Sequence, residues 1–231
     1  MIKIPATRAG VVALAELTAR GINVNATLIF SLKRYEEVAE AYQAGLRRYA
    51  REVSDDLTGL MGVASFFISR VDTALGERLK MAGLAELDGK VAIALATTVY
   101  GKFRRLFSTT EWVDLARKGA LKQAVLWAST STKDPSYPEL AYVEGLIAPQ
   151  SINTMPEATA EAFSAHGRAV VAIYGDSAEA NEVLTRVQRG GIDLEEVSEQ
   201  LTSECVGAFC DSFNAVIRTL SAKANQLVSV G

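Results

Sequence analysis

The sequence predicts an α/β fold in which helices cover a parallel sheet. Through residue 156, short apolar runs rich in β-branched residues alternate with longer runs of helical period. Strand and helix in turn are typical of parallel strands joined by helical crossovers. From Ala158 onward only helical patterns occur. A chain of 231 residues is long enough for one sizeable core. We therefore expect one α/β body with helices added after it.

Five segments have the composition of strands and should form the sheet. They are residues 1–6, 22–30, 59–69, 123–130 and a short run that ends at Pro156. The helical patterns between them are 9–21, 33–50, 87–107 and 109–120.

Three further helices are expected after the last strand, at 156–167, 177–191 and 193–229. Asp193, with Glu196 three residues later, forms a capping pattern for the last one. We predict that residues 1–164 form the α/β part and that residues 165–231 form a helical segment packed on it.

Composition excludes several classes of protein. Lys and Arg number 24 against 27 Asp and Glu, and no basic run is dense enough to predict a nucleic-acid partner. No apolar stretch approaches the roughly 20 residues of a membrane span, and no signal-peptide pattern opens the chain. The expected location is the cytoplasm. Cys205 and Cys210 match no zinc or redox spacing and are expected to be reduced, buried thiols.

Polar side chains recur on the predicted strands or just after them. In parallel α/β folds, reactive residues gather at the carboxyl ends of strands. Each residue taken alone has an ordinary explanation: a strand Asn or Thr as a satisfied core group, Lys3 as a snorkelling lysine, Arg70 as a solvated loop residue. His166 ends a helix and is not expected to be catalytic. The candidates are Lys3, Thr7, Asn23, Asn25, Thr27, Ser65, Ser69, Arg70, Ser129, Lys133, Asn153 and Thr154.

One chemistry accounts for this set without a metal or a nucleotide loop. A lysine amine withdrawn from water attacks a ketone as the neutral base and forms a Schiff base, which then acts as an electron sink. Arg70 supplies a planar cation suited to a phosphate, and Ser65 and Lys133 could add donors. A phosphorylated ketose would satisfy both ends of such a site.

Several motifs in order resemble those of transaldolases, from Met1 to roughly Ser221. They are "IKIPAT", "GINVNATLIFS", "VASFFISRVDT", "LWASTSTKDPSYPELAYVEGLI", "NTMPEAT" and "CDSF". The resemblance is closest to the long bacterial and plant type, whose chains carry extra C-terminal helices. It implies a (βα)8 TIM barrel of class I aldolase type that needs neither a cofactor nor a metal.

The resemblance also assigns roles to individual residues. It implies that Lys3 is the Schiff-base lysine on the fourth barrel strand, and that Asn25 and Thr27 contact the substrate and order the catalytic water. Ser65, Phe67 and Arg70 would line the site and bind phosphate. Thr7 and Ser129 match further site positions. Ser131 replaces an arginine of one branch of the family, so that phosphate contact is assigned to Lys133.

If Lys3 stands on the fourth strand, the sequence contains strands four to eight only. The family's acidic residues of the first and third strands, which serve as general acid and base, would then be missing. We expect a truncated barrel with two open sheet edges. The implied activity is transfer of a dihydroxyacetone unit from sedoheptulose 7-phosphate or fructose 6-phosphate to glyceraldehyde 3-phosphate or erythrose 4-phosphate. The alternative is a defective fragment that binds sugar phosphate weakly or associates through its open edges.

Overall fold

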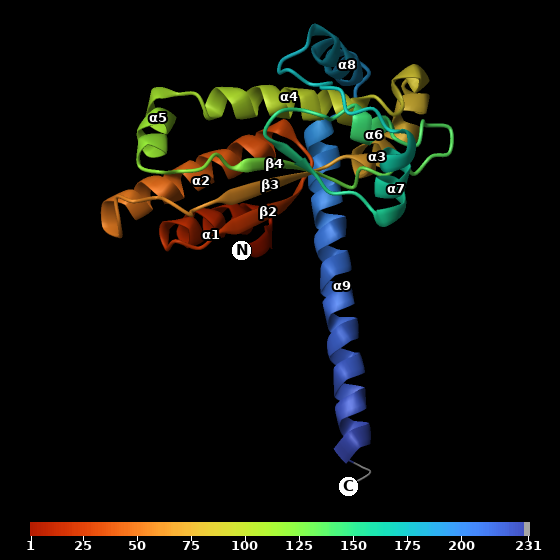
Figure 1. Cartoon of the computed structure of the whole chain (residues 1–231). Helices are drawn as coiled ribbons and strands as arrows, with labels where there is room; N and C mark the ends of the chain where they lie inside the picture. The colour runs from red at the N-terminus through yellow and green to blue at the C-terminus, as the bar shows by residue number, and fades with distance from the viewer. Residues whose placement is uncertain (229–231) are drawn as a thin grey trace.

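The computed structural model describes residues 1–228 and contains one parallel sheet in the order β1-β2-β3-β4-β5 (Figure 1). The predicted α/β class is confirmed, and each of the five predicted strands is present in shorter form. The strands are β1 (Ile2–Pro5), β2 (Val24–Ile29), β3 (Gly62–Phe67), β4 (Ala124–Ala128) and β5 (Ser151–Asn153).

The helices follow the predicted order with two additions, α3 and α6. They are α1 (Arg8–Ala19), α2 (Leu32–Glu52), α3 (Ser69–Met81), α4 (Val91–Leu106), α5 (Thr110–Arg117), α6 (Ala141–Glu144), α7 (Glu157–His166), α8 (Ala178–Arg189) and α9 (Leu194–Val228). A single 3₁₀ turn, η1 (Ala85–Leu87), precedes α4.

Two predicted boundaries were wrong. The helix expected from residue 87 begins only at Val91, because Gly89 has a φ of 75° and turns the chain between η1 and α4. The strand expected to reach residue 69 ends at Phe67, because Ser69 is already the first residue of α3.

The core lies on one face of the sheet. Side chains alternate between the two faces of a strand, and Ala64, Phe66 and Trp127 are fully buried on the face that the helices cover. On the opposite face exposure is greatest toward the sheet edges: Lys3 is exposed, Asn25 is half-buried and Ile152 is 42% exposed, whereas Ser65 in the middle of the sheet is 1% exposed. The face that carries Lys3 and Ile152 is called the open face below.

Strands β1 and β5 are the two edges of the sheet, since each pairs with one neighbour only in the described chain. Five parallel strands with helical crossovers are compatible with part of a (βα)8 barrel. The incomplete barrel itself stays a prediction.

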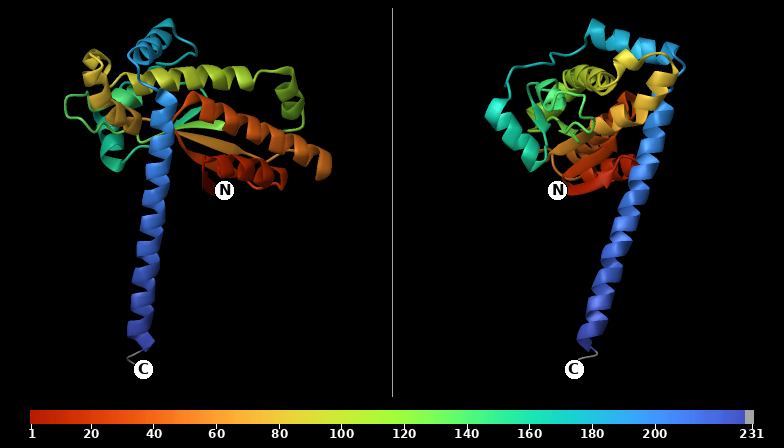
Figure 2. Two further views of the ribbon diagram at one scale, coloured as in Figure 1. Left: turned by 180° about the vertical axis from the view of Figure 1, so that it is seen from behind. Right: turned by 90° about the vertical axis from the view of Figure 1, so that its right-hand side faces the viewer.

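The C-terminal helices differ in how they contact the body. Helix α8 packs on α4, and the first turns of α9 pack on α3 and β2, where Val197, Leu201 and Cys205 are buried. The remainder of α9 projects away from the other elements (Figures 1 and 2). Phe213 on this part is 65% exposed. The expectation that Cys210 is buried was therefore wrong, because α9 has already left the body at that residue.

Residues 229–231, which the predictions included in the last helix or in the C-terminal segment, lie outside the described part of the chain. The division at residues 164 and 165 stays a prediction. No helix within residues 1–228 combines the length and the apolar character needed to cross a membrane.

Candidate active site

Lys3, Asn25 and Ser65 lie together on the open face of the sheet. Lys3 on β1 is the register partner of Asn25 on β2, so the two side chains share a face. Asn25 is paired in turn with Val63, and Ser65 lies two residues further along β3 on the same face. The Ser65 hydroxyl donates a hydrogen bond of 2.7 Å to Asn25 Oδ1. This bond fixes the orientation of the Asn25 amide and leaves its NH₂ group directed to other partners.

Thr27 stands two residues after Asn25 on the same strand. Here the β2–β3 register shifts, and Leu28 has a φ of 61°, so β2 carries a bulge. Thr27 is 3% exposed, and its hydroxyl has no hydrogen-bond partner among the described residues. A buried hydroxyl without a partner costs roughly 1–3 kcal/mol. The bulge thus holds a polar group in a place where water or a ligand would satisfy it.

The exposure of Lys3 differs from the sequence-based expectation. A Schiff-base lysine was expected to be withdrawn from water, but the Lys3 side chain is exposed in this chain. The reason is its position on edge strand β1, where Ile2 beside it is also 47% exposed. The desolvated lysine is therefore a correction: the described residues position Lys3 without enclosing it.

A second group of candidates lies where β3 and β4 end. The Ser69 backbone N–H donates to the Ser129 carbonyl at 3.0 Å, and the two hydroxyls are 2.8 Å apart. Ser129 has a φ of 57°, an uncommon conformation for a residue other than glycine. Arg70 follows Ser69 in the first turn of α3, and no side chain of the described chain caps the N-terminus of that helix.

Arg70 is exposed, and its Nη1 donates to the buried Cys205 Sγ at 3.1 Å. Cys205 belongs to α9, so the last helix holds this guanidinium near the carboxyl ends of β3 and β4. This end of the sheet is called the sheet mouth below. A guanidinium has five N–H donors, and this contact uses one of them. Arg70 can therefore still bind an anion with the others.

Thr7 and Phe67 have structural partners of their own. The Thr7 hydroxyl accepts a 3.0 Å hydrogen bond from the Gly10 backbone and caps α1. Phe67 is half-buried and packs on Phe30, with ring centroids 5.6 Å apart. Both lie at the carboxyl ends of their strands, but their contacts give no direct evidence of a ligand.

The remaining candidates do not join the Lys3 group. Lys133 is exposed in the loop after β4, where its Nζ donates to Ser131 Oγ at 2.9 Å. Asn153 accepts a 2.8 Å hydrogen bond from the Thr130 hydroxyl. Asn23 lies before β2 and accepts from the Met61 backbone at 2.9 Å, so it joins loops at the opposite end of the sheet.

One buried carboxylate near the sheet mouth, Asp72, was not among the predicted site residues. Asp72 in α3 is 1% exposed, and it accepts hydrogen bonds from the Ala92 backbone at 2.9 Å and from Tyr142 Oη at 2.8 Å. Burial raises the pKa of Asp72 to about 6, although both hydrogen bonds oppose that rise. An aspartate on the apolar side of a helix, beside Val71 and Leu75, is the sequence signal that could have identified it.

Metal binding receives no support from the described chain. No group of three or more His, Cys, Asp or Glu side chains within residues 1–228 lies in an arrangement that could hold a metal ion. The two cysteines are free, one buried and one exposed.

Comparison with known proteins connects this geometry to a family. The family model described as Transaldolase/Fructose-6-phosphate aldolase matches residues 1–220. "Transaldolase 1" of Streptomyces avermitilis is 46% identical over 235 residues, which cover 96% of this chain and 61% of that protein. "Transaldolase" of Frankia alni is 45% identical, covering 95% of this chain and 60% of its own length.

A third curated relative, "Transaldolase" of Acidothermus cellulolyticus, is 46% identical over 95% of this chain and 60% of its own length. The chain thus spans about three-fifths of the length of the curated relatives it matches.

Proposed function

The chain belongs to the transaldolase/fructose-6-phosphate aldolase family, and from that premise we propose that it carries the Schiff-base half of a transaldolase site. The single observation that carries the proposal is the register of the sheet. It sets Lys3 beside Asn25, whose amide is oriented by Ser65, on the face that the helices leave open. The buried Thr27 hydroxyl, for which residues 1–228 supply no hydrogen-bond partner, lies on the same strand as Asn25.

The five strands are proposed to be strands four to eight of a (βα)8 barrel, with the open face as its interior. The parallel order, the helical crossovers and the polar residues at strand ends all support this placement. In a closed barrel, further strands would cover β1 and withdraw Lys3 from water. A cytoplasmic location is proposed along with the activity.

The reaction begins with the Lys3 amine. Its Nζ adds to the C2 carbonyl of the ketose, and loss of water gives an iminium. The C3–C4 bond then breaks, its electron pair moves into the iminium to give a three-carbon enamine, and the C4 hydroxyl proton passes to a general base as the aldehyde leaves. The enamine attacks the aldehyde of the acceptor, and hydrolysis of the new iminium frees Lys3. The resemblance places the general base on the first strands of the barrel.

Asn25 and Thr27 are proposed to hold the substrate hydroxyls and the water that adds to the iminium. The free NH₂ group of Asn25 can donate to a hydroxyl, and the Thr27 hydroxyl can both donate and accept. Phe67 and Thr7 would shape the walls of the site.

The phosphate is proposed to lie at the N-terminus of α3. Arg70 and the Ser129 hydroxyl, which lies 2.8 Å from the Ser69 hydroxyl, stand by the first turn of that helix, and no side chain among residues 1–228 caps it. Lys133 would add charge only if its loop moved, because its amine now bonds to Ser131. The proposed substrates are sedoheptulose 7-phosphate and fructose 6-phosphate as donors, and erythrose 4-phosphate and glyceraldehyde 3-phosphate as acceptors.

Borohydride trapping tests the proposal directly. The chain is incubated with fructose 6-phosphate and reductant, and the labelled peptide is identified by mass spectrometry. We expect a three-carbon or six-carbon adduct on Lys3, none in Lys3→Arg, and an unchanged adduct in the control Lys33→Arg, which alters an exposed lysine of α2. An adduct on another lysine would contradict the assignment.

A second candidate function is supported by the uncovered apolar residues at the sheet edges. Ile2 on β1 and Ile152 on β5 are 47% and 42% exposed. Open strand edges pair readily with another chain, so the fragment could act by association instead of catalysis. Gel filtration with a coupled turnover assay separates the two functions: association without turnover favours the second candidate, and a monomer that turns over excludes it.

A further inference from the structure

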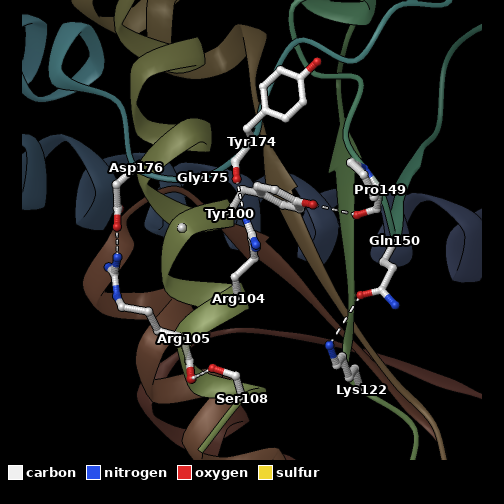
Figure 3. Close-up of a pocket in the computed structure, with 11 residues that line it drawn as sticks. Tyr100, Arg104, Arg105, Ser108, Lys122, Pro149, Gln150, Tyr174, Gly175 and Asp176 are labelled. Atoms are coloured by element: carbon white, nitrogen blue, oxygen red, sulfur yellow. Dashed lines mark hydrogen bonds and ion pairs between the residues drawn. The ribbon is translucent and has the colours of Figure 1, made fainter.

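A basic pocket lies at the end of the sheet opposite to the Lys3 site. It is lined by the C-terminal half of α4, by the residues just before β4 and β5, and by residues 174–176, which lead to α8 and are called the strap below (Figure 3). Its volume is about 830 Å³, which falls within the range of small-molecule sites. The polar residues used below are Arg104, Arg105, Lys122, Gln150, Tyr174 and Asp176.

The charge of this pocket is opposite in sign to that of the whole chain. Arg104, Arg105 and Lys122 face a single carboxylate, Asp176, so the lining has an excess of two positive charges. The chain as a whole has a net charge of −3. Like charges gathered in one hollow repel one another, and an anionic ligand would relieve that repulsion.

The partners of the three cations show which of them remain available. Arg105 pairs with Asp176, whereas Arg104 donates to the Tyr174 backbone carbonyl, and Lys122 Nζ lies 3.4 Å from Gln150 Oε1 (Figure 3). Within the described part of the chain, neither Arg104 nor Lys122 forms an ion pair. These two charges are therefore neutralised by no side chain of the pocket.

The pocket walls are held in place by close contacts. A Cβ atom on Gly101 of α4 would collide with Asp176, so a glycine is required for the strap to lie against the helix. Gln150 has a φ of 60°, and the conformation directs its side chain toward Lys122. Uncommon backbone conformations of this kind concentrate at ligand sites.

The aromatic side chains add a second kind of recognition. Tyr100 is 4% exposed and donates its hydroxyl proton to the Pro149 carbonyl at 2.9 Å, so it forms the fixed floor of the pocket. Tyr174 is 70% exposed, and its ring stands at the rim of the pocket and points away from Arg104 and Lys122 (Figure 3). An exposed aromatic ring at the rim can stack on the planar base of a nucleotide whose phosphates extend from the rim to the cations.

We propose that this pocket binds a nucleoside di- or triphosphate, with Arg104 and Lys122 on the phosphates and the Tyr174 ring against the base. A single inorganic phosphate would fill only a small part of the volume, and a sugar phosphate would leave the Tyr174 ring without a planar partner. The site is separate from the proposed Schiff-base site and does not depend on its activity.

Calorimetric titration of the 231-residue chain with ATP tests the site. We expect one ATP per chain, weaker binding of pyrophosphate and no binding of adenosine. Arg104→Gln with Lys122→Gln should weaken ATP binding at least tenfold. The matched control, Lys80→Gln with Arg189→Gln, removes two exposed charges that do not line the pocket and should leave ATP binding unchanged.

Several results would overturn the proposal. They are absence of ATP binding, equal loss in the control pair, adenosine binding as tightly as ATP, or pyrophosphate binding as tightly as ATP. Loss of ATP binding in Arg70→Ala would place the nucleotide at the sheet mouth instead. Lys122→Gln alone leaves the strap contacts of Arg104 and Arg105 intact, so a loss of binding in that variant with an unchanged melting curve separates ligand contact from folding.

Discussion

The two faces of the sheet are built from the same five strands, yet they hold different chemistry. On the covered face Ala64, Phe66 and Trp127 are fully buried under helices. On the open face Lys3, Asn25 and Ser65 alternate with them at a period of two residues. Residues that stabilise the core and residues of the proposed site therefore alternate along each strand.

A fusion that covers the open face with further strands should have the largest predicted effect, and that effect is on turnover. The Streptomyces avermitilis relative is longer than this chain. The part of that relative that precedes its match to this chain would be fused ahead of Met1. General acid and base groups contribute about 10² to 10⁴ in rate each, so we expect turnover to rise at least about 10²-fold over the chain alone. A coupled assay with fructose 6-phosphate and erythrose 4-phosphate measures it.

The same fusion carrying Lys3→Ala serves as the control and should lose turnover. If the unfused chain is a cooperatively melting monomer with full activity, the partial barrel is the wrong interpretation of this sheet.

Two adjacent phenylalanines, one on each face, allow the contribution of the two faces to the free energy of unfolding to be compared. Phe66 is fully buried on the covered face and Phe67 is half-buried on the open one. Phe66→Ala should cost about 3–5 kcal/mol because it leaves a cavity in the core. Phe67→Ala should cost about 1–2 kcal/mol because part of its ring is already in water. Urea unfolding of both variants gives the comparison, and equal losses would mean that the two faces are packed alike.

Much of this two-faced architecture is readable from the sequence. The β-branched runs predict the strands, and the motif order brings Lys3, Asn25 and Ser65 to neighbouring strands. Helix α3 was missed because its N-cap, Ile68, has no capping side chain and continues the strand pattern without a break. The exposure of Lys3 and Cys210 could not be predicted, because exposure depends on which elements cover a residue and not on its neighbours in the chain.

Asp72 lies beneath the sheet mouth and should make stability depend on pH. Its pKa of about 6 in the folded protein is above the usual value of 3.8, because burial disfavours the charged carboxylate. Its contribution to stability is therefore fully present below about pH 4 and is lost as the pH rises through 6.

Asp72→Asn removes that titration. The free energy of unfolding of Asp72→Asn relative to the natural chain should rise by up to about 3 kcal/mol between pH 4 and pH 7. Denaturant titrations at several pH values measure this difference. A difference that stays constant with pH would show that the Asp72 carboxyl titrates as it does in the unfolded chain.

Arg70→Ala should have the smallest predicted effect, and that effect should be on substrate binding. The Arg70 guanidinium sits at the N-terminus of α3, and within residues 1–228 it bonds to Cys205 alone, so removing it takes a bidentate contact from a phosphate without opening the core. In the fused chain, Arg70→Ala should raise the KM for fructose 6-phosphate at least about tenfold, or roughly 1.4 kcal/mol, with a smaller change in kcat. Arg78→Ala is the matched control, since Arg78 lies on the same helix and also bonds to α9, through Gln200 at 2.7 Å. Loss of the α3–α9 contact alone would raise KM in both variants, whereas phosphate recognition by Arg70 predicts a rise in Arg70→Ala only.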